Sequence, residues 1–216
     1  MTLTTDHEAP RLPPVYSLHQ TPGADPTAAA LRAARGGEEE GALFWDSDCP
    51  DLRIALLLRP DAPLVPSLEI LIVAAVGVGD ALAALTPPQL PVAFGWPNRI
   101  LLNGGAVAHL AIAAADAPAD AVPDWMVLSL KVDMAANWED DAPGARPDLT
   151  NLAEEGADDI GQVELLEAIS RHLLSWVARW QSEEGLTPAL ASWRARSVDS
   201  TEPLDPTRLR LLGVLT

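Results

Sequence analysis

The basic side chains that could bind an anion lie in two short segments of this sequence. Lys131 is the only lysine among 216 residues, and it lies in the most regular alternating segment, residues 125–134. Alternation places Lys131 on the same strand face as Ser129 and Asp133. An ammonium there could bind an anion, so Lys131 is the candidate catalytic group. The alternative interpretation is an ion pair with Asp133 or another nearby carboxylate.

The second segment, FGWPNRILLNGGAVAH at residues 94–109, has the pattern of a hairpin, with short apolar runs separated by turn residues. Trp96 is interpreted either as a pocket wall that stacks on a planar ligand or as a core plug. Arg99 is either a phosphate ligand or a surface residue beside the turn. His109 is either catalytic or a hydrogen-bonded structural residue.

The sequence does not favour several other common kinds of catalytic or metal-binding site. Cys49 lies among Asp46, Asp48 and Asp51, whose charges raise the pKa of a thiol and oppose nucleophilic catalysis by it. No His/Cys cluster predicts a metal site, and neither a phosphate-binding loop with lysine nor a Gly-x-Ser-x-Gly motif occurs.

The elements that must position these residues alternate between strand and helix patterns. We expect strands over residues 42–45, 52–58, 91–96, 99–103, 107–115 and 125–134, and helices over 27–34, 66–85, 161–184 and 188–193. In the 125–134 strand, one face should be core and the other mostly polar. The apolar run 70–79 is too short to span a bilayer and predicts a buried helix.

The pattern predicts one domain over residues 26–196. Residues 1–25, which are rich in Pro, Thr and His, should form an extended N-terminal arm. Residues 137–149 show no periodicity and predict a mobile loop. The C-terminal tail, residues 197–216, could add a strand.

Four segments, taken in order, resemble the catalytic domain of the biotin/lipoate A/B protein ligase family. Trp96-Pro97-Asn98 followed by Gly104-Gly105 resembles the family's Lys-Trp-Pro-Asn-Asp hairpin. Residues 150–156, with the long helix and the segment 184–193 after them, resemble the end of that domain. Residues 46–53 and 129–133 match the family's Gly-Arg-Gly-Arg loop and Gly-x-Gly-x-Asn strand in position but not in residues.

The resemblance implies an α+β fold, a mixed and mainly antiparallel sheet covered by helices on one face. It implies ATP-dependent formation of a biotinyl or lipoyl adenylate and transfer of the acyl group to a lysine of a carrier domain. Its ligand site would include ten residues of this chain, namely Trp96, Asn98, Arg99, Gly104, Gly105, Ala106, His109, Ser129, Lys131 and Asp133.

The cations that this reaction needs are missing from the matching positions. Gly95 replaces the lysine before Trp-Pro-Asn, Ala106 replaces the second hairpin lysine, and the Arg-rich loop is replaced by the acidic DSDCPDLR at 46–53. Loss of one preorganised cation typically lowers a rate by on the order of a hundredfold to a thousandfold. Two interpretations stay open: a divergent ligase, and a non-catalytic relative that binds an acyl ligand, a carrier domain or a partner protein.

Charge and composition narrow the class of partner. Thirty-one acidic against fourteen basic residues give a net charge of -17, which repels nucleic acid and anionic lipid surfaces. The family resemblance implies a small carboxylic acid or its adenylate as the ligand. One cysteine and the absence of a basic region followed by an apolar run at the N-terminus favour a cytoplasmic protein.

Overall fold

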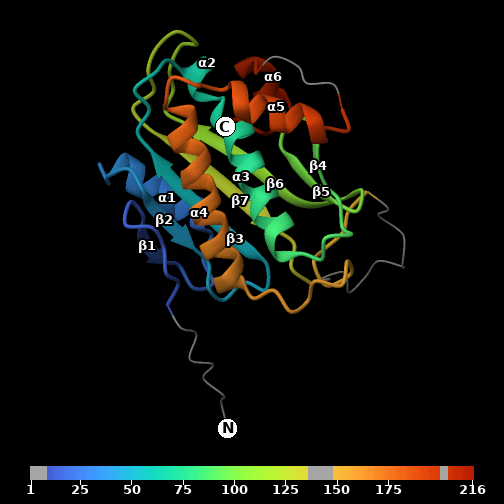
Figure 1. Ribbon diagram of the computed structural model, residues 1–216. Helices are drawn as coiled ribbons and strands as arrows, with labels where there is room; N and C mark the ends of the chain where they lie inside the picture. Colours follow the sequence, from blue (N-terminus) through green and yellow to red (C-terminus); the bar gives the residue numbers. More distant parts are fainter. Residues whose placement is uncertain (1–8, 136–147, 200–203) are drawn as a thin grey trace.

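Strands from both halves of the chain form one mixed sheet (Figure 1). The computed structural model describes residues 9–135, 148–199 and 204–216. Within them the sheet has seven strands in the order β1-β2-β3-β7-β6-β5-β4. Their bounds are β1 Ser17–Gln20, β2 Ala42–Trp45, β3 Leu52–Leu58, β4 Val92–Gly95, β5 Arg99–Leu102, β6 Gly105–Ala114 and β7 Met126–Val132. All neighbours are antiparallel except the parallel pair β1 and β2, so the predicted α+β class is confirmed.

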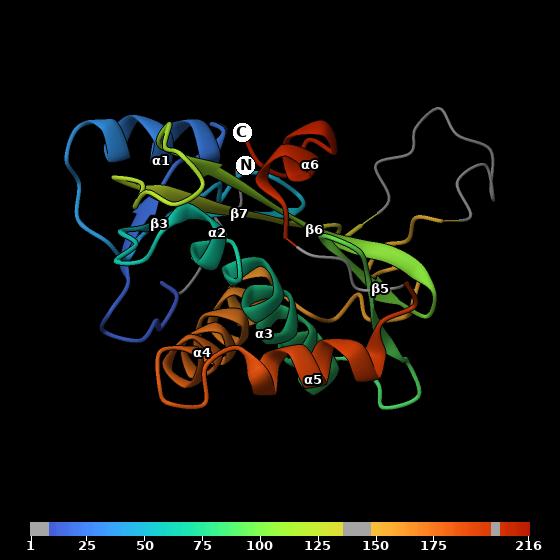
Figure 2. The ribbon, with the colours of Figure 1, turned by 90° about the horizontal axis from the view of Figure 1, so that it is seen from above.

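Helices cover both faces of this sheet, so the expectation of helices on one face was wrong. Figure 2 shows α3 (Ile70–Leu85), α4 (Gln162–Trp180) and α5 (Thr187–Arg196) on one side, and α1 (Pro26–Arg35) and α6 (Pro206–Leu211) on the other. The cause is a second apolar core beneath α1, which contains Phe44, Leu57 and Val127. The face of β7 that alternation predicted as mostly polar therefore buries Val127 completely.

The most apolar helix is buried in the main core. Residues 64–85 are long and apolar enough to cross a membrane, but 72% of their most apolar window is buried against the sheet and the other helices. The predicted helix 66–85 is two helices, α2 (Leu64–Ser67) and α3. Gly77 of α3 faces α4 so closely that a Cβ atom there would lie 3.0 Å from the Cα of Leu173. This small residue sets the spacing of the two helices.

The hairpin between β5 and β6 forms because its two turn residues accept positive φ angles. Asn103 has φ 52° and Gly104 has φ 94°, and an Asn-Gly pair with positive φ at both positions matches the right-handed twist of paired strands. The predicted meander β4-β5-β6 is therefore confirmed, within a residue or two at its ends.

The chain ends make more regular structure than the sequence indicated. Residues 17–20 of the predicted arm form β1 at the sheet edge. In the tail, residues 206–211 are helical, and the described residues at its two ends pair with the sheet, where Val198 N–H donates to the Phe94 carbonyl and Thr216 N–H to the Ile112 carbonyl, both at 2.9 Å. The predicted loop 137–149 lies outside the described residues except for its last two.

Candidate functional site

A cavity of about 250 Å³ lies between the start of α1 and the sheet. The sheet contributes Arg53 and Ile54 of β3, Ser129, Leu130 and Lys131 of β7, and His109, Leu110 and Ala111 of β6. Asp25, Pro26 and Thr27 line it from α1, and Asn98 lines it from the turn between β4 and β5. The cavity thus brings together four of the ten predicted ligand residues: Asn98, His109, Ser129 and Lys131.

The start of α1 is capped by Asp25 and is joined to the sheet through Thr27. Asp25 is the N-cap and accepts from the Thr27 backbone N–H at 2.9 Å, with Pro26 at the first helical position. The hydroxyls of Thr27 and Ser129 lie 2.9 Å apart and share a hydrogen bond. The helix therefore joins β7 directly, and Ser129 is partly committed to holding it.

Lys131 is held between two carboxylates. Its Nζ lies 3.2 Å from Asp51 Oδ2 and also bonds Asp133 Oδ1. Burial lowers the pKa of Lys131, but hydrogen bonds and charge from Asp133 and Asp51 outweigh burial and raise it. The ion-pair interpretation made from the sequence is confirmed. An ammonium that is charged and doubly paired is neither a nucleophile nor a free anion ligand.

His109 lies beside Lys131 in the register of β6 and β7, with Arg99 opposite it on β5. Burial lowers the pKa of His109, and the positive charges of Lys131 and Arg99 lower it further, while Asp133 partly opposes them. The imidazole is therefore neutral at pH 7, with one nitrogen able to donate and the other able to accept a hydrogen bond.

The side chains of Asn98 and Arg99 are both engaged in contacts within the protein. The Asn98 amide donates to the Leu110 carbonyl at 2.7 Å, and the Leu110 N–H donates back to the Asn98 carbonyl at 2.9 Å. Arg99 pairs with Asp199 at 3.4 Å, and its guanidinium lies next to Gly95. Arg99 is thus a partly exposed residue at the turn, outside the cavity lining.

Trp96 belongs to an aromatic cluster under α5. Its ring meets Trp193 edge-on at 6.1 Å, and Phe94 stacks on Trp193 at 4.8 Å. Trp193 is fully buried. This geometry matches the core-plug interpretation of Trp96.

The residues at the far end of the hairpin lie away from the cavity. A Cβ atom on Gly105 would lie 2.8 Å from the Thr150 Cβ, and Ala106 exchanges backbone hydrogen bonds with the segment 148–150. Gly104 is an exposed turn residue. Gly104, Gly105 and Ala106 are therefore not brought together with the other predicted ligand residues.

The connection between β2 and β3, residues 46–51, is an acidic turn. Asp46 is buried and accepts from the backbone N–H groups of Gly23 and Asp48 at 2.8 and 3.2 Å. Asp51 accepts from the Met134 N–H as well as from Lys131. Carboxylates repel phosphates, so these residues do not fit the triphosphate of ATP. Within the described residues, no three His, Cys, Asp or Glu side chains are grouped to hold a metal ion.

Sequence reasoning missed Arg53 and Thr27. Arg53 is the one charged residue of the otherwise apolar strand 52–58, and a charge on such a strand is a signal for a polar cavity beside it. Thr27 could be found only from the packing of α1 on β7.

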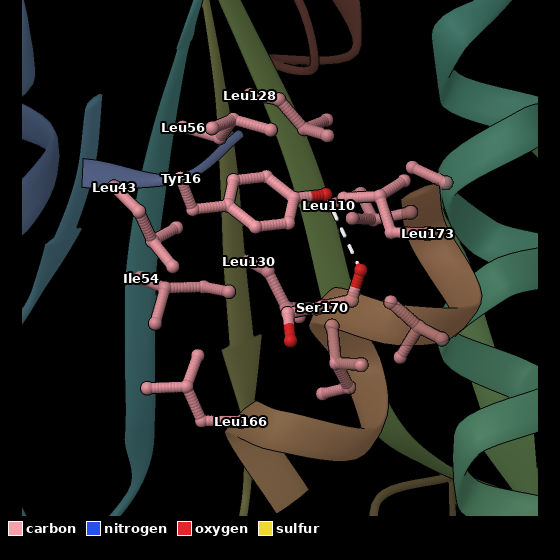
Figure 3. A pocket seen from close by; sticks show the side chains of 13 residues that line it. Tyr16, Leu43, Ile54, Leu56, Leu110, Leu128, Leu130, Leu166, Ser170 and Leu173 are labelled. Carbon is pink, nitrogen blue, oxygen red and sulfur yellow. Dashed lines mark hydrogen bonds between the residues drawn. The ribbon is translucent and has the colours of Figure 1, made fainter. Parts of the chain in front are cut away.

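A second cavity, between the sheet and α4, is part of the core. It holds only about 20 Å³, and twelve of its thirteen lining residues are aliphatic or are Tyr16, with Ser170 as the exception. Figure 3 shows the Tyr16 hydroxyl donating to the Ser170 carbonyl, at 3.3 Å, among leucine and isoleucine side chains. Burial raises the pKa of Tyr16 to about 12. The lining offers no group for ligand recognition.

Comparison with known proteins identifies the family. The model of the biotin/lipoate A/B protein ligase family matches residues 12–195. The chain belongs to the biotin/lipoate A/B protein ligase family. A family relative, the biotin–[acetyl-CoA-carboxylase] ligase of Paracoccus denitrificans, is 27% identical over 179 residues, which cover 81% of this chain and 70% of that protein.

Solved structures of the biotin/lipoate ligase fold agree. A biotin protein ligase-like protein of unknown function from Silicibacter sp. TM1040 has a TM-score of 0.78 and 33% identity, covering 88% of this chain and 81% of its own. The Aquifex aeolicus biotin protein ligase, solved in complex with biotin and ATP, has a TM-score of 0.64 at 16% identity, covering 84% of this chain and 78% of its own. At that identity the Aquifex likeness supports the fold alone.

Proposed function

We propose that this chain is a non-catalytic member of its family that binds a small carboxylic acid in the cavity between α1 and the sheet. The observation that carries the proposal is the state of Lys131. This only lysine of the chain is paired with Asp51 and Asp133 and has a raised pKa. No lysine is therefore left to stabilise the charge that develops when an acid reacts with ATP.

The neighbouring groups support the same proposal. The acidic turn 46–51 repels phosphates, and Ala106, in place of a hairpin lysine, is completely buried. Of the relatives named above, the Paracoccus protein is a biotin ligase and the Aquifex biotin protein ligase is solved with biotin and ATP. In this proposal the chain retains binding of the acid and has lost formation of the acyl-adenylate.

A divergent ligase is the second candidate, and Arg53 is the observation in its favour. Its guanidinium lines the cavity and could replace one missing cation. In that case biotin, lipoate and ATP would be substrates, and a biotinyl or lipoyl carrier domain would be the partner.

Exchange of pyrophosphate into ATP in the presence of biotin, lipoate or octanoate separates the two candidates. We expect no exchange above that of a blank without the protein with any of the three acids. Exchange that exceeds this control would overturn the non-catalytic proposal. In parallel, thermal stabilisation by an acid tests the binding itself, since a ligand at a hundred times its Kd adds about 2.7 kcal/mol to stability.

A further inference from the structure

A third cavity, of about 390 Å³ and open to solvent, lies where α4 begins. The turn that follows β2, the residues just after β7 and the segment that leads into α4 line it together. It shares no lining residue with the cavity between α1 and the sheet. Figure 2 shows α4 and α1 on opposite faces of the sheet. The third cavity is therefore a separate site.

The walls of the third cavity are mainly apolar. Trp45, the last residue of β2, and Ile160 are buried, and Met134 and Val163 are partly buried beside them. Three alanines complete these walls. Apolar and aromatic walls with a few polar groups are typical of sites for organic ligands, because the apolar surface of the ligand leaves water there.

Gln162, the first residue of α4, holds two of these walls together. Its side-chain amide donates to the carbonyls of Cys49 and Pro50 at 2.6 and 3.2 Å. Its side-chain oxygen accepts from the indole N–H of Trp45 at 3.3 Å. These bonds join the turn after β2 to the start of α4, so the site is formed before a ligand arrives. They also use both hydrogens of the amide, so other groups must recognise a ligand.

Two polar side chains of the lining are free to bind a ligand. The Ser47 hydroxyl and the Asp158 carboxylate form no hydrogen bond or ion pair with the part of the chain that the structure describes. Asp158 is exposed and is the only charged residue among the described lining residues. A carboxylate beside an apolar wall favours a cationic group that can pair with it.

The wider field at this cavity has the same sign. Asp159 and Glu164, which flank lining residues in the sequence, are also exposed carboxylates. The start of α4 opposes them, because its N–H groups carry the equivalent of about half a positive charge. The carboxylates of Asp158, Asp159 and Glu164 exceed that half charge, and no Lys or Arg is among the described lining residues. The net field attracts cations and repels acids.

We propose that the third cavity binds an organic cation, a primary amine with an aromatic or branched aliphatic body. The ammonium pairs with Asp158 and donates to the Ser47 hydroxyl, while the body lies against Trp45, Met134 and Ile160. This site goes beyond the proposed binding of an acid, since it takes a ligand of opposite charge on the other face of the sheet. The two sites share no residue, so each can fail without the other.

Methionine methyl groups report this site in solution. The chain has three methionines, of which Met134 lines the cavity and Met126 is buried at the opposite end of β7. The full chain, isotope-labelled at its methionine methyl groups, is titrated with phenethylamine, tryptamine and isoamylamine and followed by nuclear magnetic resonance. Phenethyl alcohol is the neutral match and hydrocinnamate the acidic match, and Met134→Leu assigns the signal.

We expect the amines to move the Met134 signal to saturation and to leave the Met126 signal in place. Phenethyl alcohol should bind about fivefold more weakly than phenethylamine, and hydrocinnamate should not bind. Asp158→Asn should weaken binding of phenethylamine about fivefold and leave that of phenethyl alcohol unchanged. Asp120→Asn, at an exposed aspartate outside the lining, is the matched control and should keep the wild-type affinity.

Three kinds of result overturn the proposal. A Met134 signal that stays fixed with all three amines, or that moves together with the Met126 signal, removes the site. Equal affinity for phenethylamine and phenethyl alcohol, or an unchanged amine affinity in Asp158→Asn, removes the cationic class of ligand. Binding of hydrocinnamate in place of the amines reverses the sign of the charge that the site selects.

Discussion

Lys131 of β7 and Asp51, the last residue before β3, form an ion pair with 3.2 Å between Nζ and Oδ2. The Asp51 side chain is only 3% exposed, whereas that of Lys131 is 42% exposed. The ion pair therefore stabilises the buried Asp51 carboxylate more than the Lys131 ammonium, since an unpaired buried charge is costly.

Removal of this ammonium should destabilise the fold. We expect Lys131→Met to lower the free energy of unfolding by about 1–3 kcal/mol, because the buried Asp51 carboxylate loses its cation. The double variant Lys131→Met with Asp51→Asn should recover much of that loss. Urea denaturation of both variants and of Asp51→Asn alone gives the coupling energy. Additive effects would show that the pair contributes nothing.

The buried phenol of Tyr16 should titrate far above its ordinary value. The chain has one tyrosine, so the absorbance of the tyrosinate anion reports the ionisation of this residue alone. We expect a midpoint near pH 12 in the folded chain and near 10.0 in urea. Because the pKa is raised in the folded state, Tyr16 lowers stability as pH rises from about 10 to 12. The Tyr16→Phe variant should lose less stability over this pH range. A titration midpoint near pH 10 in the folded chain would contradict the burial of the phenol.

His109 should affect stability in the opposite pH range. Its pKa is lowered in the folded state, so the unfolded chain binds the proton more readily below the ordinary value of 6.5. Stability from this residue should be complete above pH 6.5 and fall as the pH drops below it. Nuclear magnetic resonance titration of the four histidines, with His109→Gln for assignment, should find His109 below 6.5. A His109→Gln chain with unchanged acid dependence of unfolding would refute this account.

Close packing of α3 and α4 should make Gly77 intolerant of a methyl group. Alanine is normally better than glycine in a helix by about 1 kcal/mol. At Gly77 we expect Ala to destabilise by about 1–3 kcal/mol instead, since the new Cβ would meet the Leu173 backbone. Ala178→Gly, at an exposed position inside α4, is the control and should lower stability by about 1 kcal/mol, the ordinary helix preference. A Gly77→Ala chain that is more stable than the wild type in thermal melts would remove the packing argument.

Local patterns predicted most of the elements but little of the site. The alternation in 125–134 predicted β7, and the helical pattern of 27–34, which follows the helix-starting pair Asp25-Pro26, predicted α1. Both predictions hold within a residue or two, because such signals act within a few residues. The same Asp-Pro signal at residues 205–206 begins α6 and was overlooked in favour of a strand. Val127 lies on the strand face that the sequence predicts as mostly polar. Alternation separates the two faces of a strand but does not show which elements pack on each face.

The site is formed by strands that lie far apart in the sequence. Hydrophobic periodicity within one segment does not show which strands pair. Arg53 and Lys131 are 78 positions apart in the sequence, yet they are neighbours across β3 and β7. The candidate list made from the resemblance included Gly105 and Ala106, which the segment 148–150 covers. Arg53 became a candidate only once the strand register was known.

The single lysine also makes the chain a convenient target for chemical labelling. Amine-reactive esters should modify Lys131 alone, apart from the chain's N-terminal amine, so a fluorophore can be attached beside the cavity without any engineered cysteine. The paired carboxylates keep that amine protonated, so the reaction should be slow at neutral pH and accelerate in alkaline buffer or once Asp51 is replaced by asparagine.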